Sequence, residues 1–121
     1  PPHDVIRRLR QMCIRDRLNG IACANGMVEG EAFVAKSVAD AEEMPEGKIM
    51  VTKFTDPAWT VYFSKITGLI TETGGMLSHG AIISREYGIP AILAVPDALK
   101  LIKTGDRIRM NGSNGTIEIL N

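Results

Sequence analysis

Cysteine and histidine are scarce in this 121-residue sequence, which contains two of each. Cys13 and Cys23 form no CxxC pair and have no histidine at metal-ligand spacing, which argues against a zinc site or a disulfide framework. The formal net charge is zero, so there is no basic field to attract a nucleic acid or an anionic membrane. No apolar run approaches the roughly 20 residues that cross a bilayer. We therefore expect a cytoplasmic protein with no nucleic-acid or membrane partner.

Several familiar catalytic features are also missing. A Walker A loop needs a Gly-Lys-Ser/Thr run, which the sequence lacks. A nucleophile elbow needs G-x-S-x-G, but Gly75 lies three residues before Ser78. Ser78 is also adjacent to His79, where the two side chains cannot form a catalytic pair. His79 has no second ligand at helical spacing, so a metal site is not indicated.

The chain length fits one domain that can bury a modest core. Residues 1–17 differ from the rest because they are basic and Arg-rich, and the stretch QMCIRDR resembles a translated transposase end sequence used to prepare sequencing libraries. We interpret residues 1–17 as a non-native or linker segment, excluded from the fold argument. The alternative is a native amphipathic helix or a linker from an upstream domain. The folded domain is expected over residues 18–121.

Apolar periodicity and turn residues predict a compact α/β domain with a mixed sheet and a terminal β-hairpin. Residues 20–26 form a small-residue segment with an Asn-Gly turn. Strands are expected at residues 27–35, 49–53, 68–72, 91–95, 106–110 and 116–120. Helical segments are expected at residues 39–43, 56–65, 78–87 and 97–102. The helix at 78–87 should stop at Gly88, with Pro90 just beyond.

His79 stands where a glycine-rich loop gives way to the helix at residues 78–87. A helix N-terminus exposes unpaired N–H groups and about half a positive charge, which favours a phosphoryl group. The same partial charge disfavours imidazolium, so His79 is expected to be neutral and nucleophilic. These features suggest a phosphocarrier histidine. From the physical argument alone, a histidine that only caps the helix remains an equal alternative.

The sequence TGGMLSHGAI at residues 73–82, followed by REYGIPA at residues 85–91, resembles the phosphohistidine signature of the mobile, swivelling domain of phosphoenolpyruvate-utilising enzymes. The resemblance extends to TDPAW at residues 55–59 and to GTIEIL at residues 115–120. Within the family, the sequence is more similar to rifampicin phosphotransferase and phosphoenolpyruvate-synthase-like members. Pyruvate dikinase and enzyme I usually have a threonine where this chain has Leu77.

This resemblance implies a swivelling carrier domain of an ATP-dependent phosphotransferase, with His79 as its catalytic residue. A separate ATP-grasp domain would supply ATP and magnesium and phosphorylate His79, giving AMP and phosphate, while this domain binds no cofactor. An acceptor-binding domain would then take the phosphoryl group, and pyruvate, a rifamycin or an aromatic alcohol are all compatible acceptors. Such a domain is inactive alone. The alternative is a non-catalytic docking or regulatory module in which His79 stays unphosphorylated.

The loop residues Thr73, Gly74, Gly75 and Ser78 are the candidate phosphoryl-binding residues. Ser78 either donates its hydroxyl to phosphoryl oxygens or caps the helix, and Thr73 either touches the phosphate or stabilises the loop. Arg85 is six residues beyond His79 and points about 240° around the helix, so it is expected to serve another surface: a docking contact, a salt bridge or a solvated face. Asp56 and Trp59 are expected to be a helix cap and a packing anchor.

Overall fold

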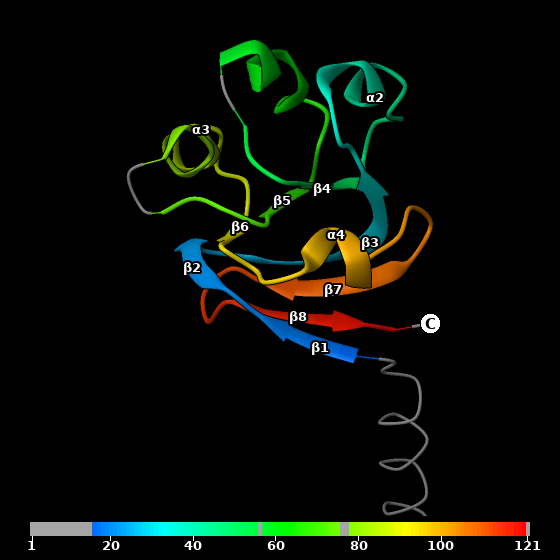
Figure 1. Ribbon diagram of the computed structural model, residues 1–121. Coiled ribbons are helices and arrows are strands. Elements are labelled where there is room, and N and C mark those ends of the chain that lie inside the picture. The colour runs from blue at the N-terminus through cyan, green and yellow to red at the C-terminus, as the bar shows by residue number, and fades with distance from the viewer. Residues whose placement is uncertain (1–15, 56, 76–77, 121) are drawn as a thin grey trace, which may run out of the picture.

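The computed structural model describes residues 16–55, 57–75 and 78–120 (Figure 1). Its eight strands form one sheet in the order β1-β8-β7-β3-β4-β5-β6-β2. The strands are β1 (Asp16–Asn19), β2 (Ile21–Ala24), β3 (Met27–Val34), β4 (Ile49–Thr52), β5 (Gly68–Thr71), β6 (Ala91–Leu93), β7 (Arg107–Asn111) and β8 (Thr116–Ile119). The expected α/β class, mixed sheet and terminal β7–β8 hairpin are confirmed.

The sheet is parallel in its middle and antiparallel on both sides. Strands β3, β4, β5 and β6 pair in parallel, whereas β2 pairs antiparallel to β6. The long strand β3 joins the two parts because residues 27–31 pair with β7 and residues 32–34 pair with β4. The carboxyl ends of the four parallel strands therefore lie at one edge of the sheet.

Four short helical segments connect the strands: α2 (Val38–Glu42), η1 (Pro57–Tyr62), α3 (His79–Tyr87) and α4 (Ala98–Leu101). Figure 1 shows α2, η1 and α3 together over one face of β4 and β5, while α4 lies on the side of β7 and β8. Within residues 16–55, 57–75 and 78–120, none of the helices has the length and apolar character needed to traverse a membrane.

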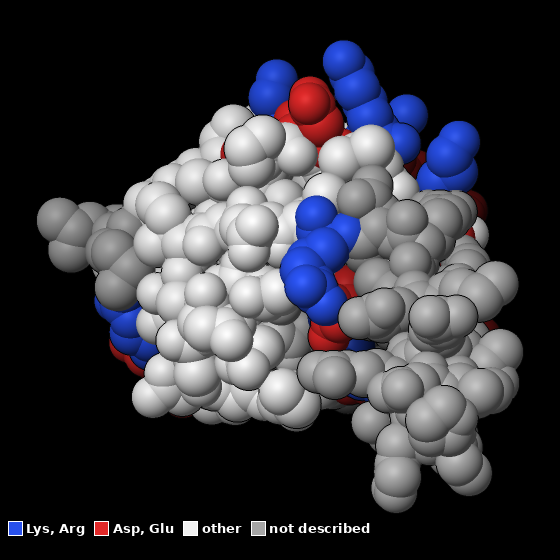
Figure 2. Space-filling view, turned by 90° about the horizontal axis from the view of Figure 1, so that it is seen from below, with Lys and Arg blue, Asp and Glu red and all other residues white. Residues whose placement is uncertain are grey.

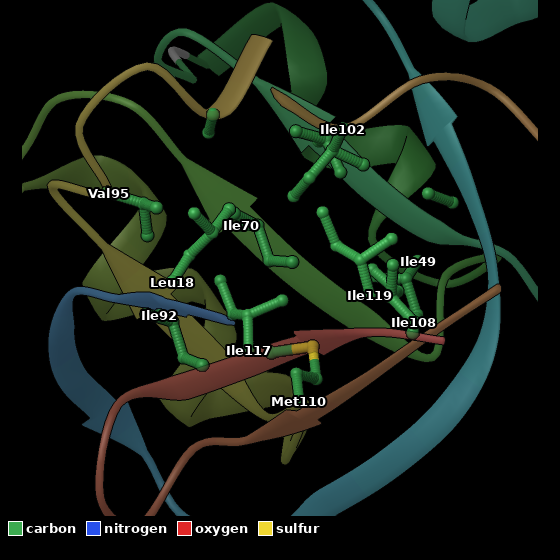
Figure 3. Close-up of a cluster of buried hydrophobic side chains, with 13 residues drawn as sticks. Leu18, Ile49, Ile70, Ile92, Val95, Ile102, Ile108, Met110, Ile117 and Ile119 are labelled. Carbon is green, nitrogen blue, oxygen red and sulfur yellow. The ribbon is translucent and has the colours of Figure 1, made fainter. Parts of the chain in front are cut away.

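The central strands are buried on both faces, as expected for parallel strands covered on two sides. Successive side chains of a strand point to opposite faces, so Met50 and Leu69 belong to a core beneath η1 and α3. Ile49, Ile70 and Ile92 point the other way, into a second core closed by β1, β7, β8 and α4 (Figure 3). Two cores thus hold the sheet edge that carries the candidate site.

Exposed ion pairs cross the antiparallel part of the sheet. Glu29 on β3 accepts from Arg107 at 3.1 Å and from Arg109 at 3.2 Å on β7. Arg17 on β1 pairs with Glu118 on β8 at 3.0 Å. On the face shown in Figure 2, basic and acidic side chains lie next to each other, so charges of the two signs are interspersed there. Solvent screens exposed pairs of this kind, so they contribute little to stability.

The structure corrects the expected boundary at the N-terminal side. Strand β1 begins at Asp16 and pairs with β8 from Ile119 to Thr116, so residues 16 and 17 belong to the folded domain that was expected to begin at residue 18. Whether the segment is foreign stays a prediction, because residues 1–15 lie outside the described part of the chain. Strand β2 was also missed, because the sequence IACA has little β-branched character and its pairing with β6 is non-local.

The remaining segments follow the sequence expectations with one change of helix type. The helix expected at residues 56–65 is a 3-10 helix over Pro57–Tyr62, followed by turns in which Phe63 N donates to Thr60 O and Lys65 N donates to Tyr62 O. Such i to i−3 bonds suit short segments. Helix α3 ends as expected, because Gly88 adopts the left-handed conformation with φ of 68°.

Candidate functional site

The candidate site lies on two loops that follow the adjacent parallel strands β4 and β5. Because both strands end at the same sheet edge, their loops meet. Thr73 N donates to Lys53 O at 3.0 Å, and Thr73 Oγ1 donates to the same carbonyl at 2.9 Å. Glu72 N donates to Thr52 O at 3.0 Å, so backbone pairing continues beyond the strands. These bonds fix the start of the glycine-rich loop against the β4 loop.

Ser78 starts the helix that carries the histidine. Its backbone is extended, and its Oγ accepts from Ala81 N at 3.4 Å, which satisfies one of the unpaired N–H groups of the first turn. The hydroxyl itself donates to Gly75 O at 2.7 Å. Of the two expected roles for Ser78, the structure therefore shows the cap, and contact with a phosphoryl group stays a prediction.

The imidazole of His79 is held at both nitrogens. Thr55 Oγ1, from the β4 loop, lies 3.2 Å from Nδ1, and Thr60 Oγ1, from η1, lies 3.3 Å from Nε2. The ring of Phe63 stacks on the imidazole with a centroid distance of 6.1 Å and an interplanar angle of 24°. The half-buried ring is thus oriented by Thr55 of the β4 loop, Thr60 of η1 and Phe63 of the turn that follows η1.

Two glycines allow the backbone to pass close to these side chains. A Cβ on Gly80 would lie 2.9 Å from Thr55 Oγ1, closer than Cβ contacts normally allow. Gly74 has a backbone φ of 121°, which residues with a side chain rarely adopt. A Cβ there would also lie 3.3 Å from Ser78 Oγ. A Cβ on Gly75, by contrast, would meet no atom within 4 Å, and the carbonyl oxygen of Gly75 accepts from the Ser78 hydroxyl.

Arg85 serves another surface, as expected. Its Nε donates to Cys23 O at 3.4 Å and attaches the end of α3 to β2. Together with Cys23, Ala24, Asn25 and Gly88 it lines a hollow of about 270 Å³. Burial raises the pKa of the Cys23 thiol, and the nearby Arg85 charge opposes that shift. The docking role considered for Arg85 stays a prediction.

The other expectations divide between confirmed structural roles and untested ones. Trp59 is buried in the core beneath η1 and α3, which confirms it as a packing anchor. The hydroxyl of Thr73 makes the loop-stabilising bond to Lys53 O, and its contact with phosphate stays a prediction. Asp56 and Leu77 lie outside the described residues. Within the described ranges, no group of three or more His, Cys, Asp or Glu residues is arranged to hold a metal ion.

Sequence reasoning missed the three side chains that hold the imidazole. Thr55 lies in the TDPAW stretch, but neither it nor Thr60 or Phe63 was assigned to the site. They precede His79 by 16 to 24 residues, and helical or strand periodicity cannot relate positions so far apart. The usable signal was topological: loops that follow neighbouring parallel strands converge at one sheet edge. A polar residue after β4 was therefore a candidate partner for His79.

Solved structures resemble this fold across different proteins. Aconitase X of Thermococcus kodakaraensis superposes with a TM-score of 0.70 at 24% identity, covering 88% of this chain and 99% of that one. This likeness shows the fold alone. An Enzyme I structure gives a TM-score of 0.57 at 25% identity, covering 65% of this chain and 33% of that chain. The phosphohistidine interpretation therefore needs support from sequence relatives.

Sequence relatives define the class of this small α/β domain, whose histidine stands at the first residue of α3. Residues 44–115 match the family described as PEP-utilising enzyme, mobile domain, and the chain belongs to that family. It is 51% identical over 100 residues to the rifampicin phosphotransferase of Bacillus subtilis, covering 83% of this chain and 11% of the relative. It is 38% identical over 101 residues to the phosphoenolpyruvate synthase of Aeropyrum pernix, covering 83% and 12%. The chain thus spans about a tenth of the length of these phosphotransferases.

Proposed function

We propose that this chain is a phosphocarrier domain and that His79 accepts a phosphoryl group from one protein site and delivers it to another. The observation that carries the proposal is the imidazole at the first residue of α3, oriented by Thr55 and Thr60 on its two nitrogens. The N-terminus of α3 supplies partial positive charge and donor groups where a phosphoryl group on the ring would develop its negative charge. Family membership supports the same role.

The transfer is a nucleophilic displacement at phosphorus. A neutral imidazole nitrogen attacks with its lone pair, a P–N bond forms, and the P–O bond to the leaving group breaks, with its electron pair leaving on oxygen. An acceptor alkoxide, deprotonated in the acceptor's own site, or an enolate oxygen then attacks the same phosphorus, and the P–N bond breaks with its electrons returning to the ring. Thr55 and Thr60 orient the ring, while Phe63 limits its tilt.

The donor and acceptor sites are assigned to other domains of a larger phosphotransferase. An ATP-grasp domain would bind ATP and magnesium and phosphorylate His79, giving AMP and phosphate over the cycle. The relatives named rifampicin phosphotransferase and phosphoenolpyruvate synthase make pyruvate or a rifamycin-like alcohol the leading acceptors. The proposal places the whole enzyme in the cytoplasm, where ATP is available.

A matched pair of incubations tests this function against a non-catalytic docking module. The donor is the full-length rifampicin phosphotransferase of Bacillus subtilis in which the residue aligned with His79 is replaced by alanine. With this donor, ATP and magnesium, intact-mass measurement should show one added phosphoryl group on the chain, and none with ATP alone. His79→Ala should remain unmodified. An unmodified wild-type chain in the complete reaction would support the docking module instead.

A further inference from the structure

A crevice of about 530 Å³ lies between α2 and α4, at the carboxyl end of β3. Its lining residues come from the end of β3, from α2, from α4 and from the segments next to these helices, and all of them are separate from the residues that contact His79. We propose that this crevice binds an organic phosphate, that is, a phosphate monoester with an apolar body. The proposal goes beyond the phosphocarrier function and gives the domain a second ligand site.

The topology of the sheet explains why a crevice forms at this position. After β3 the chain continues into α2, on the face that also carries η1 and α3, whereas after β6 it continues into α4, on the side of β7 and β8 (Figure 1). The segment leaving β3 and the segment entering β7 therefore come from opposite faces. Val34 N donates to Thr104 Oγ1 at 2.9 Å, and Gly105 N donates to Ala32 O at 2.9 Å, which holds the two segments together. Open α/β sheets bind ligands in crevices of this kind, outside the carboxyl ends of their strands.

Apolar side chains form part of the lining. Val34 and Leu99 pack against the core that β1, β7, β8 and α4 close, and Phe33 packs against the core beneath η1 and α3. All three are only partly buried and line the crevice, so they offer apolar surface to a ligand. The crevice thus lies where both cores reach the surface. Its volume falls in the range of about 300–1,000 Å³ that is typical of small-molecule sites.

Lysine side chains supply positive charge to the same crevice. Lys36, Lys100 and Lys103 line it, and among the described residues none of their ammonium groups lies within ion-pairing distance of a carboxylate. Asp40 and Glu43 lie on the α2 side, where Asp40 Oδ2 already accepts from Lys36 N at 3.0 Å. The α4 side, with Lys100 and Lys103, is therefore the positive side. Two ammonium groups there match the roughly two negative charges of a phosphate monoester.

The test uses the chain itself with phenyl phosphate, which joins an aromatic ring to a phosphate monoester. An NMR titration should shift the backbone amide signals of Lys100, Lys103 and Thr104 with a Kd of about 1 mM, the scale expected for a ligand of this size. Inorganic phosphate lacks the ring and benzyl alcohol lacks the charge, so each should bind at least about 10-fold more weakly. The double variant Lys100→Ala/Lys103→Ala should raise the Kd of phenyl phosphate about 10-fold, because two charge-assisted contacts are lost.

The matched control is Lys65→Ala, which removes the same charge from the turn after η1, outside the lining of the crevice. This variant should bind phenyl phosphate as the wild type does. Undiminished binding in the double variant, equal binding of inorganic phosphate, or amide shifts confined to the glycine-rich loop and the start of α3 would each overturn the proposal. Absence of any shift at about 10 mM phenyl phosphate, ten times the expected Kd, would also overturn it. Lys100 and Lys103 are exposed, so the double variant should keep the fold, and unchanged amide signals elsewhere in its spectrum verify this.

Discussion

The hydroxyl of Thr60 lies 3.3 Å from Nε2 of His79, and the hydroxyl of Thr55 lies 3.2 Å from Nδ1 on the opposite side of the ring. In a neutral imidazole, one nitrogen donates and the other accepts. One threonine therefore accepts a hydrogen bond from the ring, and the other donates to its lone pair. Nucleophilic attack needs that lone pair, so the second hydrogen bond must open before transfer while the first keeps the ring in place.

This asymmetry predicts different effects for the two threonines. Thr55→Val and Thr60→Val each remove a hydroxyl at nearly constant volume. The variant that loses the acceptor of the ring N–H should be phosphorylated about 2- to 10-fold more slowly, because one orienting hydrogen bond is worth about 0.5–1.5 kcal/mol. The other variant should retain at least the wild-type rate. Single-turnover labelling measures both rates, and the NMR shifts of the ring nitrogens identify the tautomer. Equal slowing in both variants would contradict this account.

Removal of the Ser78 hydroxyl should reduce stability. Ser78→Ala leaves the N–H of Ala81 without its cap and should lower the free energy of unfolding by about 0.5–2 kcal/mol, as loss of an N-cap does. Urea denaturation measures this change, with Ser78→Asp as the control that keeps a capping oxygen. If Ser78→Ala is as stable as the wild type but is labelled much more slowly, the hydroxyl acts on the phosphoryl group rather than as a cap.

The start of the folded domain is tested by a pair of truncations. Removal of residues 1–15 should leave the free energy of unfolding unchanged within about 0.5 kcal/mol, the scale of neutral surface changes. Removal of residues 1–19 eliminates β1, its pairing with β8 and the buried side chain of Leu18, and should cost more than about 2 kcal/mol. Thermal or urea denaturation distinguishes the two. A large loss from the shorter truncation would show that the first fifteen residues are integral to the domain.

The ion pairs of Glu29 predict how stability depends on pH. Hydrogen bonds from Arg107 and then from Arg109 hold the pKa of the Glu29 carboxyl below its ordinary value. A carboxyl whose pKa is lower in the folded state stabilises the fold above its unfolded pKa of about 4.3, and this contribution is lost as pH falls through the folded pKa. At low salt, the free energy of unfolding should therefore fall less steeply below about pH 4.3 in Glu29→Gln than in the wild type. Identical pH profiles would mean that solvent screens these pairs completely.

Sequence patterns identified the local elements well but not the contacts between them. The helix beginning at His79 was predictable from Ser78 and Gly88, because capping and left-handed stop residues act within one turn. The strands at 49–53 and 68–72 were predictable because double-sided burial leaves continuous apolar runs. Thr55 and Thr60 could not be predicted from local patterns as contacts of the imidazole. They reach His79 because β4 pairs in parallel with β5, which brings the segment after β4 next to the segment after β5. Strand β2 was not predicted for the same reason, because its partner β6 is distant in sequence.

The central claim is that His79 carries the phosphoryl group, and the chemical stability of the label tests it most directly. The labelled chain is divided between acid and alkali, and the retained phosphoryl group is measured by intact mass at intervals. A phosphoramidate on His79 should be lost quickly in acid and survive in alkali, and no label should form on His79→Ala. A label that survives acid, or one that persists in the His79→Ala variant, would contradict the phosphohistidine assignment.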